Sequence, residues 1–407
     1  MLATPQATDV ALGIDVGTSG VRVVATDRAG ATIAMATAPI PVPLQTGERI
    51  EQDAEVWWQA VAAALTALDV DKARVRAIAV DGTSGTILPI ADDGTPVAKA
   101  SLYNDRAEPQ HVARVAAVAP AETAALGSTS PLARAMRFGG DGRIIHQADW
   151  IAGRLGGRFD VSDENNALKS GYDPVSRCWP QWIEATGFDR RRFPRVRAAA
   201  SPLGPVTAAI AQQFGLAADC IVVAGTTDGC AAFLASGASE PGDGVTSLGT
   251  TLTIKLLSAT PVFAPQFGIY SHRIGDLWLA GGASNTGGAV IDAHFNKDDL
   301  AKLTPLLDPD RPTGLDYYPL PKPGERFPIA DPAYPPRLTP RPPEDHQFLQ
   351  ALLEGIAAIE ALGYRRLAEL GASKLGSIRT LGGGAENSAW TAMRLRALGV
   401  VDRRRRI

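Results

Sequence analysis

One polar turn in this 407-residue chain carries the side chains needed to hold a phosphate group. In "GIDVGTSG", Asp15 ends an apolar run and is followed by Gly17, Thr18, Ser19 and Gly20. Glycines permit a tight turn, and the hydroxyls and exposed turn amides are donors suited to phosphate oxygens. Asp15 could orient Mg²⁺ through water, because this ion keeps much of its hydration shell. The alternative is an ordinary hairpin turn. The spacing matches neither the P-loop nor the dinucleotide fingerprint.

A second carboxylate is placed to act as a base. In "AGTTDGCAAFL", Asp228 stands where an apolar strand gives way to a helix. A carboxylate there can take a proton from a hydroxyl as that oxygen attacks a phosphate, which typically contributes about 10² to 10⁴ in rate. With a metal and backbone donors, such a base suffices for phosphoryl transfer. The alternative is a simple helix cap.

Two further segments suit a polyol. "DGTSGT" at 81–86 ends an apolar strand, and "LYNDRA" adds Asn104, Asp105 and Arg106. A polyol needs such a mixture because each hydroxyl both donates and accepts, and an unpaired buried partner costs about 1 to 3 kcal/mol. The alternative is a pair of surface turns.

These groups depend on an alternating α/β framework. Three β-rich runs, a helix at "DAEVWWQAVAAALTAL" and a strand at "RVRAIAVDG" open the chain. A second hairpin, "VTSLGTTLTIK", repeats the opening pattern, and a strand at "SIRTLGGG" precedes a helix. Residues 105–215 are predicted as helices and loops, and the proline-rich residues 303–343 as an irregular crossing. A long amphipathic helix follows at "HQFLQALLEGIAAIEALGYRRLAEL".

Composition narrows the class of protein. The length predicts two domains, with a cleft between them a natural site. Apolar residues make up 45% and the net charge is -3, which gives no field for nucleic acid or a membrane surface. We therefore expect small-molecule partners. The three cysteines form no C-x-x-C pair, and we expect buried thiols. No leader or membrane-spanning run is seen, which predicts a cytoplasmic protein.

Seven motifs in order resemble the FGGY carbohydrate kinases. They are "GIDVGTSG", "DGTSGT", "YNDRA", "AGTTDG", "SLGTT", "GERFP" and "LGGGAEN". The resemblance covers nearly the whole chain and implies an α/β fold with two actin-like (ribonuclease H-like) ATPase domains and a cleft between them. It places the N-terminal domain at 1–225 and the C-terminal domain, which binds nucleotide, at 226–407. Within the family the motifs look most like the short D-ribulose kinases, the xylulose-kinase-like group.

The resemblance implies a role for each motif. Asp228 would be the catalytic base, Asp15, Ser84 and Asp228 would line the sugar pocket, and Asp15 would also serve the metal. Nucleotide and phosphate contacts would come from Thr18, Ser19, Gly249, Thr250, Thr251, Gly383, Gly384 and Asn387.

The implied activity is an ATP- and Mg²⁺-dependent pentulose kinase that converts D-ribulose to D-ribulose 5-phosphate. One alternative is a kinase for xylulose or another polyol. Another is a non-catalytic nucleotide- or sugar-binding protein, because the family normally continues past "RALGVVDRRRRI" with a further strand and helix. The arginines at 403–406 are expected to be solvated rather than to bind nucleic acid. The sequence predicts no oligomeric state. The D-ribulose kinases do not keep the whole Asn104, Asp105 and Arg106 triplet, so the resemblance assigns it no ligand contact.

Overall fold

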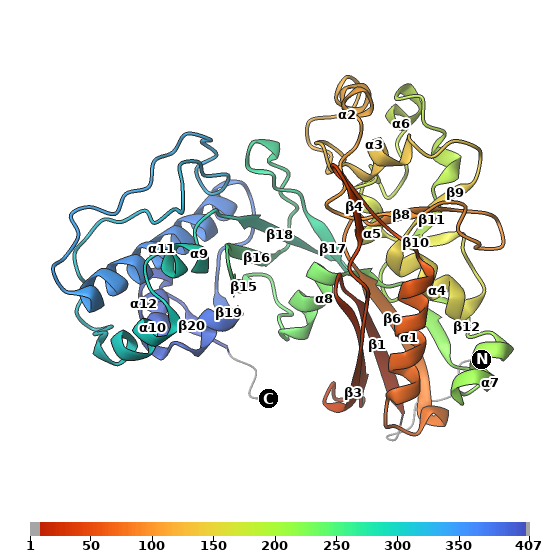
Figure 1. Ribbon diagram of the computed structural model, residues 1–407, viewed down its shortest axis with the longest axis horizontal. Coiled ribbons are helices and arrows are strands. Elements are labelled where there is room, and N and C mark those ends of the chain that lie inside the picture. Colours follow the sequence, from red (N-terminus) through yellow and green to blue (C-terminus); the bar gives the residue numbers. More distant parts are fainter. Residues whose placement is uncertain (1–8, 404–407) are drawn as a thin grey trace. The chain divides into compact units, whose positions relative to one another are not determined.

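The computed structural model describes residues 9–403 (Figure 1), so most of the arginine run at 403–406 lies outside the described residues. The chain divides into two compact units, Met1–Ala232 and Phe233–Ile407. The sequence predicts a boundary after residue 225, and the division falls a short way beyond it, within α8 (Asp228–Ala235). Each unit is described by itself.

The main sheet of the first unit is built on the opening hairpin. β1 (Val10–Val16) and β2 (Gly20–Thr26) pair antiparallel, and β3 (Thr32–Pro39) pairs with the far side of β2. β6 (Val75–Gly82) lies parallel to β1 on the other side. The sheet runs in the order β12-β13-β6-β1-β2-β3, and β14 also pairs with β6. The three short strands are β12 (Pro202–Pro205), β13 (Ile221–Val223) and β14 (Thr226–Thr227). The four strands predicted from the opening of the sequence are confirmed.

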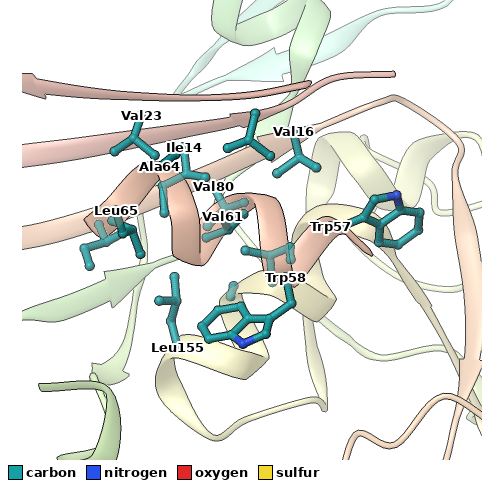
Figure 2. Packing of buried hydrophobic residues seen from close by; sticks show 14 of the residues in the cluster. Ile14, Val16, Val23, Trp57, Trp58, Val61, Ala64, Leu65, Val80 and Leu155 are labelled. Atoms are coloured by element: carbon teal, nitrogen blue, oxygen red, sulfur yellow. The ribbon is translucent and has the colours of Figure 1, made fainter. Parts of the chain in front are cut away.

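A helix packed on this sheet fixes the positions of the strand ends. α1 (Glu55–Ala67) buries one face, including Val61 and Ala64. Figure 2 shows these side chains close to Ile14 and Val80 of the sheet, in a single cluster of buried residues. Burial of this kind contributes roughly 25 cal/mol per Å² of apolar surface. β1 and β6 are therefore held firmly together below the turn that carries the polar groups.

The rest of the first unit contains short elements that the sequence pattern did not reveal. The sequence predicts only helices and loops for residues 105–215, and this is wrong for four short strands there. Strands of three or four residues are too short to show a period-two pattern. A second sheet runs in the order β4-β5-β8-β7-β9, and β10 pairs with β11. These strands are β4 (Leu44–Thr46), β5 (Arg49–Gln52), β7 (Ile87–Ile90), β8 (Ala100–Ser101), β9 (Arg143–His146), β10 (Val161–Asp163) and β11 (Arg195–Arg197). The helices are α2 (Pro109–Ala116), α3 (Pro131–Ala135), α4 (Gln147–Gly156), α5 (Glu164–Leu168), α6 (Trp182–Ala185) and α7 (Ala208–Phe214).

The second unit repeats the same hairpin arrangement. β15 (Asp243–Leu248) and β16 (Leu252–Ser258) pair antiparallel, and β19 (Ser377–Leu381) lies parallel to β15. The full order is β17-β18-β16-β15-β19-β20. The remaining strands are β17 (His272–Ile274), β18 (Leu277–Ala283) and β20 (Val401–Asp402). The second hairpin that the sequence predicts is confirmed.

Two helices provide most of the helical packing of the second unit. α11 (Asp345–Glu369) matches the predicted long helix, and α12 (Ser388–Leu398) follows the glycine turn after β19. α9 (Gly288–Asp292) and α10 (Lys297–Leu303) are short. The predicted proline-rich crossing is irregular after a single 3-10 turn at Thr304–Leu306, with isolated bridges such as that between Tyr318 and Arg337.

Two further expectations concern the cysteines and the membrane. Cys220 and Cys230 are buried as expected, whereas Cys178 is exposed, so burial of all three thiols was a wrong prediction. Cys178 lies in a short turn where Ser176 Oγ is 3.2 Å from its Sγ. Among residues 9–403, no helix is both long enough and apolar enough to cross a membrane.

Candidate functional site

The turn between β1 and β2 presents its hydroxyls to solvent. Gly17 N–H donates to Gly20 C=O (3.0 Å) and closes the turn, while Thr18 and Ser19 are exposed at its tip. A Cβ on Gly20 would lie 2.9 Å from the Ala38 carbonyl oxygen, so only glycine fits beside the neighbouring strand. The tip is therefore a fixed turn with free hydroxyls.

Three aspartates meet at the carboxyl ends of neighbouring strands. In the parallel pairing of β1 and β6, Asp15 lies opposite Asp81. On the other side of β6, Thr226 lies opposite Asp81, and Asp228 follows two residues later as the first residue of α8. Neighbouring strands are about 4.8 Å apart. The register therefore places Asp81 between the two aspartates that the sequence predicts as functional.

Burial and mutual repulsion keep a proton within this group. Burial, followed by the negative charges of Asp15, Asp228 and Asp163, raises the pKa of Asp81 to about 8. Asp81 and Asp15 share a hydrogen bond, which stabilises the protonated form of Asp81 and the ionised form of Asp15. Burial raises the pKa of Asp15 as well, partly offset by Arg22, whose Nη1 lies 3.3 Å from Asp15 Oδ2.

Asp228 is the most exposed residue of the three. Its side chain is exposed, and Oδ1 accepts the amide N–H of Gly229 (2.7 Å). Its charge contributes to the raised pKa of both Asp15 and Asp81. An exposed carboxylate at the head of a helix, beside two others, can approach a substrate hydroxyl and accept its proton.

A fixed loop carries Ser84 close to the same strand end. Thr83 donates its amide N–H and its hydroxyl to Gln147 Oε1 (3.0 and 2.9 Å), and its Oγ1 lies 2.6 Å from Thr86 Oγ1. The buried Arg134 donates from Nη2 to the Gly85 carbonyl. Because the loop is held on both sides, Ser84 has a defined position.

The triplet at 104–106 is divided between structural and exposed roles. Asp105 is fully buried, and its carboxylate accepts from Ser101 Oγ (2.5 Å), Arg137 Nη1 (2.6 Å) and the Ile50 amide (3.1 Å). Arg106 Nη1 donates to Glu48 Oε1 (2.8 Å), and Asn104 is exposed. The oxygens of Asp105 are thus already engaged in holding β5, β8 and the segment after α3 together.

Two buried residues, Asp163 and Asn166, hold the strand that precedes Asp228. Asn166 Nδ2 donates to the Thr226 carbonyl (3.0 Å) and to Asp163 Oδ2 (2.6 Å). Burial, followed by the charge of Asp149, raises the pKa of Asp163 to about 6. These two residues fix the short strand β14, which directly precedes Asp228.

In the second unit, the turn after β15 is packed against a second glycine pair. Gly288 N–H donates to the Gly249 carbonyl (2.8 Å), and Ala289 N–H donates to the Thr250 carbonyl (3.1 Å). A Cβ on Gly287 would lie 2.7 Å from the Thr250 oxygen and from the Thr251 Cα. The predicted phosphate hairpin is therefore positioned by a segment that the sequence analysis did not single out.

The glycine turn after β19 lies next to this hairpin, because Leu381 pairs with Ser247. Gly382 has φ +87° and lies against the Leu248 carbonyl, where a Cβ would be 2.6 Å away. A Cβ on Gly384 would lie 2.5 Å from the Trp390 ring, whereas one on Gly383 would have no neighbour within 4 Å. Gly383 is the open member of the triplet.

Asn387 has a structural contact as well. Its Oδ1 accepts the Trp390 amide (2.9 Å) and caps α12, so its predicted contact with adenosine would use the remaining NH₂ group.

Two family models match the chain, and together they account for about two thirds of it. The FGGY family of carbohydrate kinases, N-terminal domain, matches residues 10–121, and the corresponding C-terminal domain matches residues 244–401. The chain belongs to the FGGY family of carbohydrate kinases. This is a family of phosphotransferases, and the two-domain α/β arrangement predicted from the sequence is its fold.

Curated FGGY relatives are similar at low identity. Xylulose kinase from Escherichia coli is 26% identical over 313 residues, which cover 72% of this chain and 63% of that protein. Autoinducer-2 kinase from Yersinia enterocolitica is 25% identical over 452 residues, covering 98% of this chain and 83% of that protein. The chain thus spans under two thirds of the first relative and more than four fifths of the second.

Solved FGGY structures share the fold. Xylulose kinase from Rhodospirillum rubrum has a TM-score of 0.82 at 22% identity, covering 96% of this chain and 86% of that one. Glycerol kinase from Plasmodium falciparum, solved with ADP, has a TM-score of 0.81 at 14% identity and covers 97% and 85%.

Asp81 and the supporting residues Asp163 and Asn166 were not predicted from the sequence. Asp81 opens the quoted "DGTSGT", and a carboxylate ending an otherwise apolar strand was an available signal. Its pairing with Asp15 was not available, because β1 and β6 are parallel strands joined by a long crossover rather than by a tight turn that would fix their register.

Proposed function

We propose that this FGGY chain is an ATP-dependent kinase that phosphorylates the terminal hydroxyl of a pentulose, D-ribulose, to give D-ribulose 5-phosphate. The observation that carries the proposal is the meeting of Asp15 and Asp81 with the exposed Asp228, at strand ends next to a turn of free hydroxyls.

Each group has a part in the reaction. Asp228 accepts the proton of the sugar's terminal hydroxyl while that oxygen bonds to the γ-phosphorus of ATP. The bond from this phosphorus to the β–γ bridging oxygen breaks, and ADP leaves with the electron pair. Thr18 and Ser19 donate hydrogen bonds to the transferring phosphoryl oxygens. Proton removal by such a base contributes about 10² to 10⁴ in rate.

Asp15 suits a magnesium ion that arrives with the nucleotide. Its side chain is 40% exposed, so it can reach a hydrated ion, and carboxylate oxygen is a ligand that Mg²⁺ prefers. Bound Mg²⁺ would neutralise phosphate charge as it develops. Among the described residues, no cluster of three or more His, Cys, Asp or Glu side chains is arranged to hold a metal.

The second unit supplies the nucleotide contacts in this proposal. Gly249, Thr250 and Thr251 would hold phosphate oxygens, and the open Gly383 would border the adenosine with Gly384 and Asn387. The glycerol kinase from Plasmodium falciparum was solved with ADP, which supports a nucleotide role for the shared fold.

The choice of D-ribulose rests on the likeness of "DGTSGT" and "AGTTDG" to the short D-ribulose kinases. The named relatives are xylulose and autoinducer-2 kinases, so D-xylulose and autoinducer-2 are the competing acceptors to test.

The test is ADP release from Mg-ATP by the purified chain. The acceptors are D-ribulose, D-xylulose, L-ribulose, glycerol, autoinducer-2 and no acceptor. We expect the highest kcat/KM with D-ribulose and little release without an acceptor. A higher value with another acceptor would reassign the substrate, and release with none of them would reject the kinase proposal.

A further inference from the structure

Two polar side-chain atoms, one near the end of β6 and one in the loop just after it, lack hydrogen-bond partners although they are shielded from solvent. Among the described residues, neither Asp81 Oδ1 nor Ser84 Oγ has a hydrogen-bond partner. Leaving a buried polar group unpaired costs about 1 to 3 kcal/mol, so native proteins rarely tolerate it. Both atoms belong to one strand-loop segment, three residues apart. Such a pair suits a ligand group that both donates and accepts a hydrogen bond.

The backbone that carries these two atoms is held in place. Thr83, between them, is tied to Gln147 by its amide and its hydroxyl. The carbonyl of Gly85 is held by the buried Arg134, and Asp81 is fixed by its place in β6. The loop is therefore preorganised, and the missing partners must come from outside it.

A structural role does not account for Asp81. It lies opposite Asp15 across the β1–β6 pair and opposite Thr226, two residues before Asp228, so three carboxyl groups crowd one strand end. A carboxyl group in such surroundings lowers the stability of the folded protein. Costs of this kind are typically found where a protein gains function.

We propose that Asp81 is a further sugar-binding residue, which together with Ser84 holds one secondary hydroxyl of the acceptor. This rests on the proposed function, because it assigns the contact within the same sugar site. Asp81 Oδ1 accepts a hydrogen bond from the sugar hydroxyl, and Ser84 Oγ–H donates one to the same hydroxyl oxygen. Since Asp81 lies between Asp15 and Asp228, the bound hydroxyl is close to the one that is phosphorylated, and it helps determine which pentulose is accepted.

The test is calorimetric binding of D-ribulose and of its 3-deoxy and 4-deoxy analogues, with turnover measured in parallel. The proteins are the wild type, Asp81→Ala, Asp81→Asn and a control, Asp71→Asn, at the opposite end of β6. Asp71 only caps the short turn before that strand.

We expect Asp81→Ala to weaken D-ribulose binding about 10- to 100-fold, with MgATP affinity unchanged. Asp81→Asn keeps an accepting oxygen and should recover part of the affinity. One deoxy analogue should bind the wild type more weakly than D-ribulose does. In Asp81→Ala this analogue and D-ribulose should bind equally well. Neither variant should melt at a lower temperature than the wild type, because both remove a carboxyl group from an acidic cluster.

Other results would overturn the inference. One is equal D-ribulose affinity in the wild type and Asp81→Ala. Another is that every analogue loses the same affinity, relative to D-ribulose, in both proteins. A third is a loss of sugar affinity in Asp81→Ala that is accompanied by a lower melting temperature. Asp81-dependent binding without any phosphorylation would support the inference while rejecting the proposed kinase activity.

Discussion

The two units share one strand arrangement but carry different chemistry at the same positions. In the first unit β1 pairs antiparallel with β2 and parallel with β6, and in the second β15 pairs antiparallel with β16 and parallel with β19. Asp15 lies opposite Asp81 in the first, two residues before Gly17. Ser247 lies opposite Leu381 in the second, two residues before Gly249. A pair of carboxyl groups in one unit corresponds to a hydroxyl and a leucine in the other.

This difference shows how one framework can serve two ligands. Carboxylates suit sugar hydroxyls and proton transfer, but they repel phosphate oxygens. The second unit has no carboxylate at these two positions and instead brings glycine backbone close to the strand end, as at Gly382 and Gly384. The comparison therefore supports the proposal that the first unit binds the sugar and the second binds the nucleotide.

The largest expected effect is the loss of the base from the first unit. Asp228→Asn keeps the shape of the side chain but cannot accept a proton. We expect kcat to fall about 10²- to 10⁴-fold, with sugar and ATP affinity nearly unchanged. Steady-state kinetics and calorimetry measure the two effects, and a kcat within threefold of the wild type would remove Asp228 as the base.

A second prediction concerns a carboxylate introduced into the second unit at the position that Asp15 has in the first unit. Ser247→Asp gives β15 the carboxylate that β1 has at Asp15. We expect ATP affinity to fall roughly 10- to 100-fold, because the new charge would repel phosphates bound at this hairpin as proposed, while sugar affinity is retained. Ser247→Asn is the matched neutral control. If the Asp and Asn variants bind ATP equally well, phosphate does not lie at this hairpin.

A third prediction separates packing from ligand contact within the glycine turn. In Gly384→Ala the new methyl group would meet Trp390 and Leu248, so we expect a loss of about 1 to 3 kcal/mol in unfolding free energy. Gly383→Ala meets no neighbour and should keep its stability, but ATP affinity should fall a few-fold. Denaturant titration and ATP binding test both variants. Unchanged ATP binding in Gly383→Ala would place adenosine elsewhere.

A fourth prediction is an opposite response of the two units to pH. The pKa values of Asp81 and Asp163 are raised to about 8 and about 6, so the folded first unit binds more protons than the unfolded chain above about pH 4. Its stability should therefore fall as pH rises from about 4 to 8. In the second unit, burial would raise the pKa of Asp243, but hydrogen bonds, led by that from Ser377, lower it to about 2. This contribution is lost only as pH falls from about 4 toward 2.

Hydrogen exchange, corrected for intrinsic rates, measures this difference strand by strand. Amides of β1 and β6 should be less protected at pH 8 than at pH 5, and the change should shrink in Asp81→Asn. Equal or greater protection of β1 and β6 at pH 8 would contradict the expected charge distribution.

The sequence revealed the parts of each unit that depend on local pattern. Short β-rich runs and the glycine turns predicted both hairpins. Asp15 was singled out at the end of an apolar run, and Asp228 at the junction of an apolar strand and a helix. Contacts between distant segments were not predictable. Asp81 meets Asp15 only through the parallel pairing of β1 with β6, and Gly288 reaches Gly249 only through the folded second unit. The short strands between residues 143 and 205 were missed because they have no periodicity.

The most direct test of the central claim is phosphorus NMR of the purified chain with Mg-ATP and D-ribulose. We predict that the γ-phosphate signal disappears only when the sugar is present. A phosphomonoester triplet should replace it, because phosphorus on a terminal CH₂–O group couples to two protons. Inorganic phosphate as the product, a doublet from a secondary position, or an unchanged ATP spectrum would contradict phosphorylation of the terminal hydroxyl.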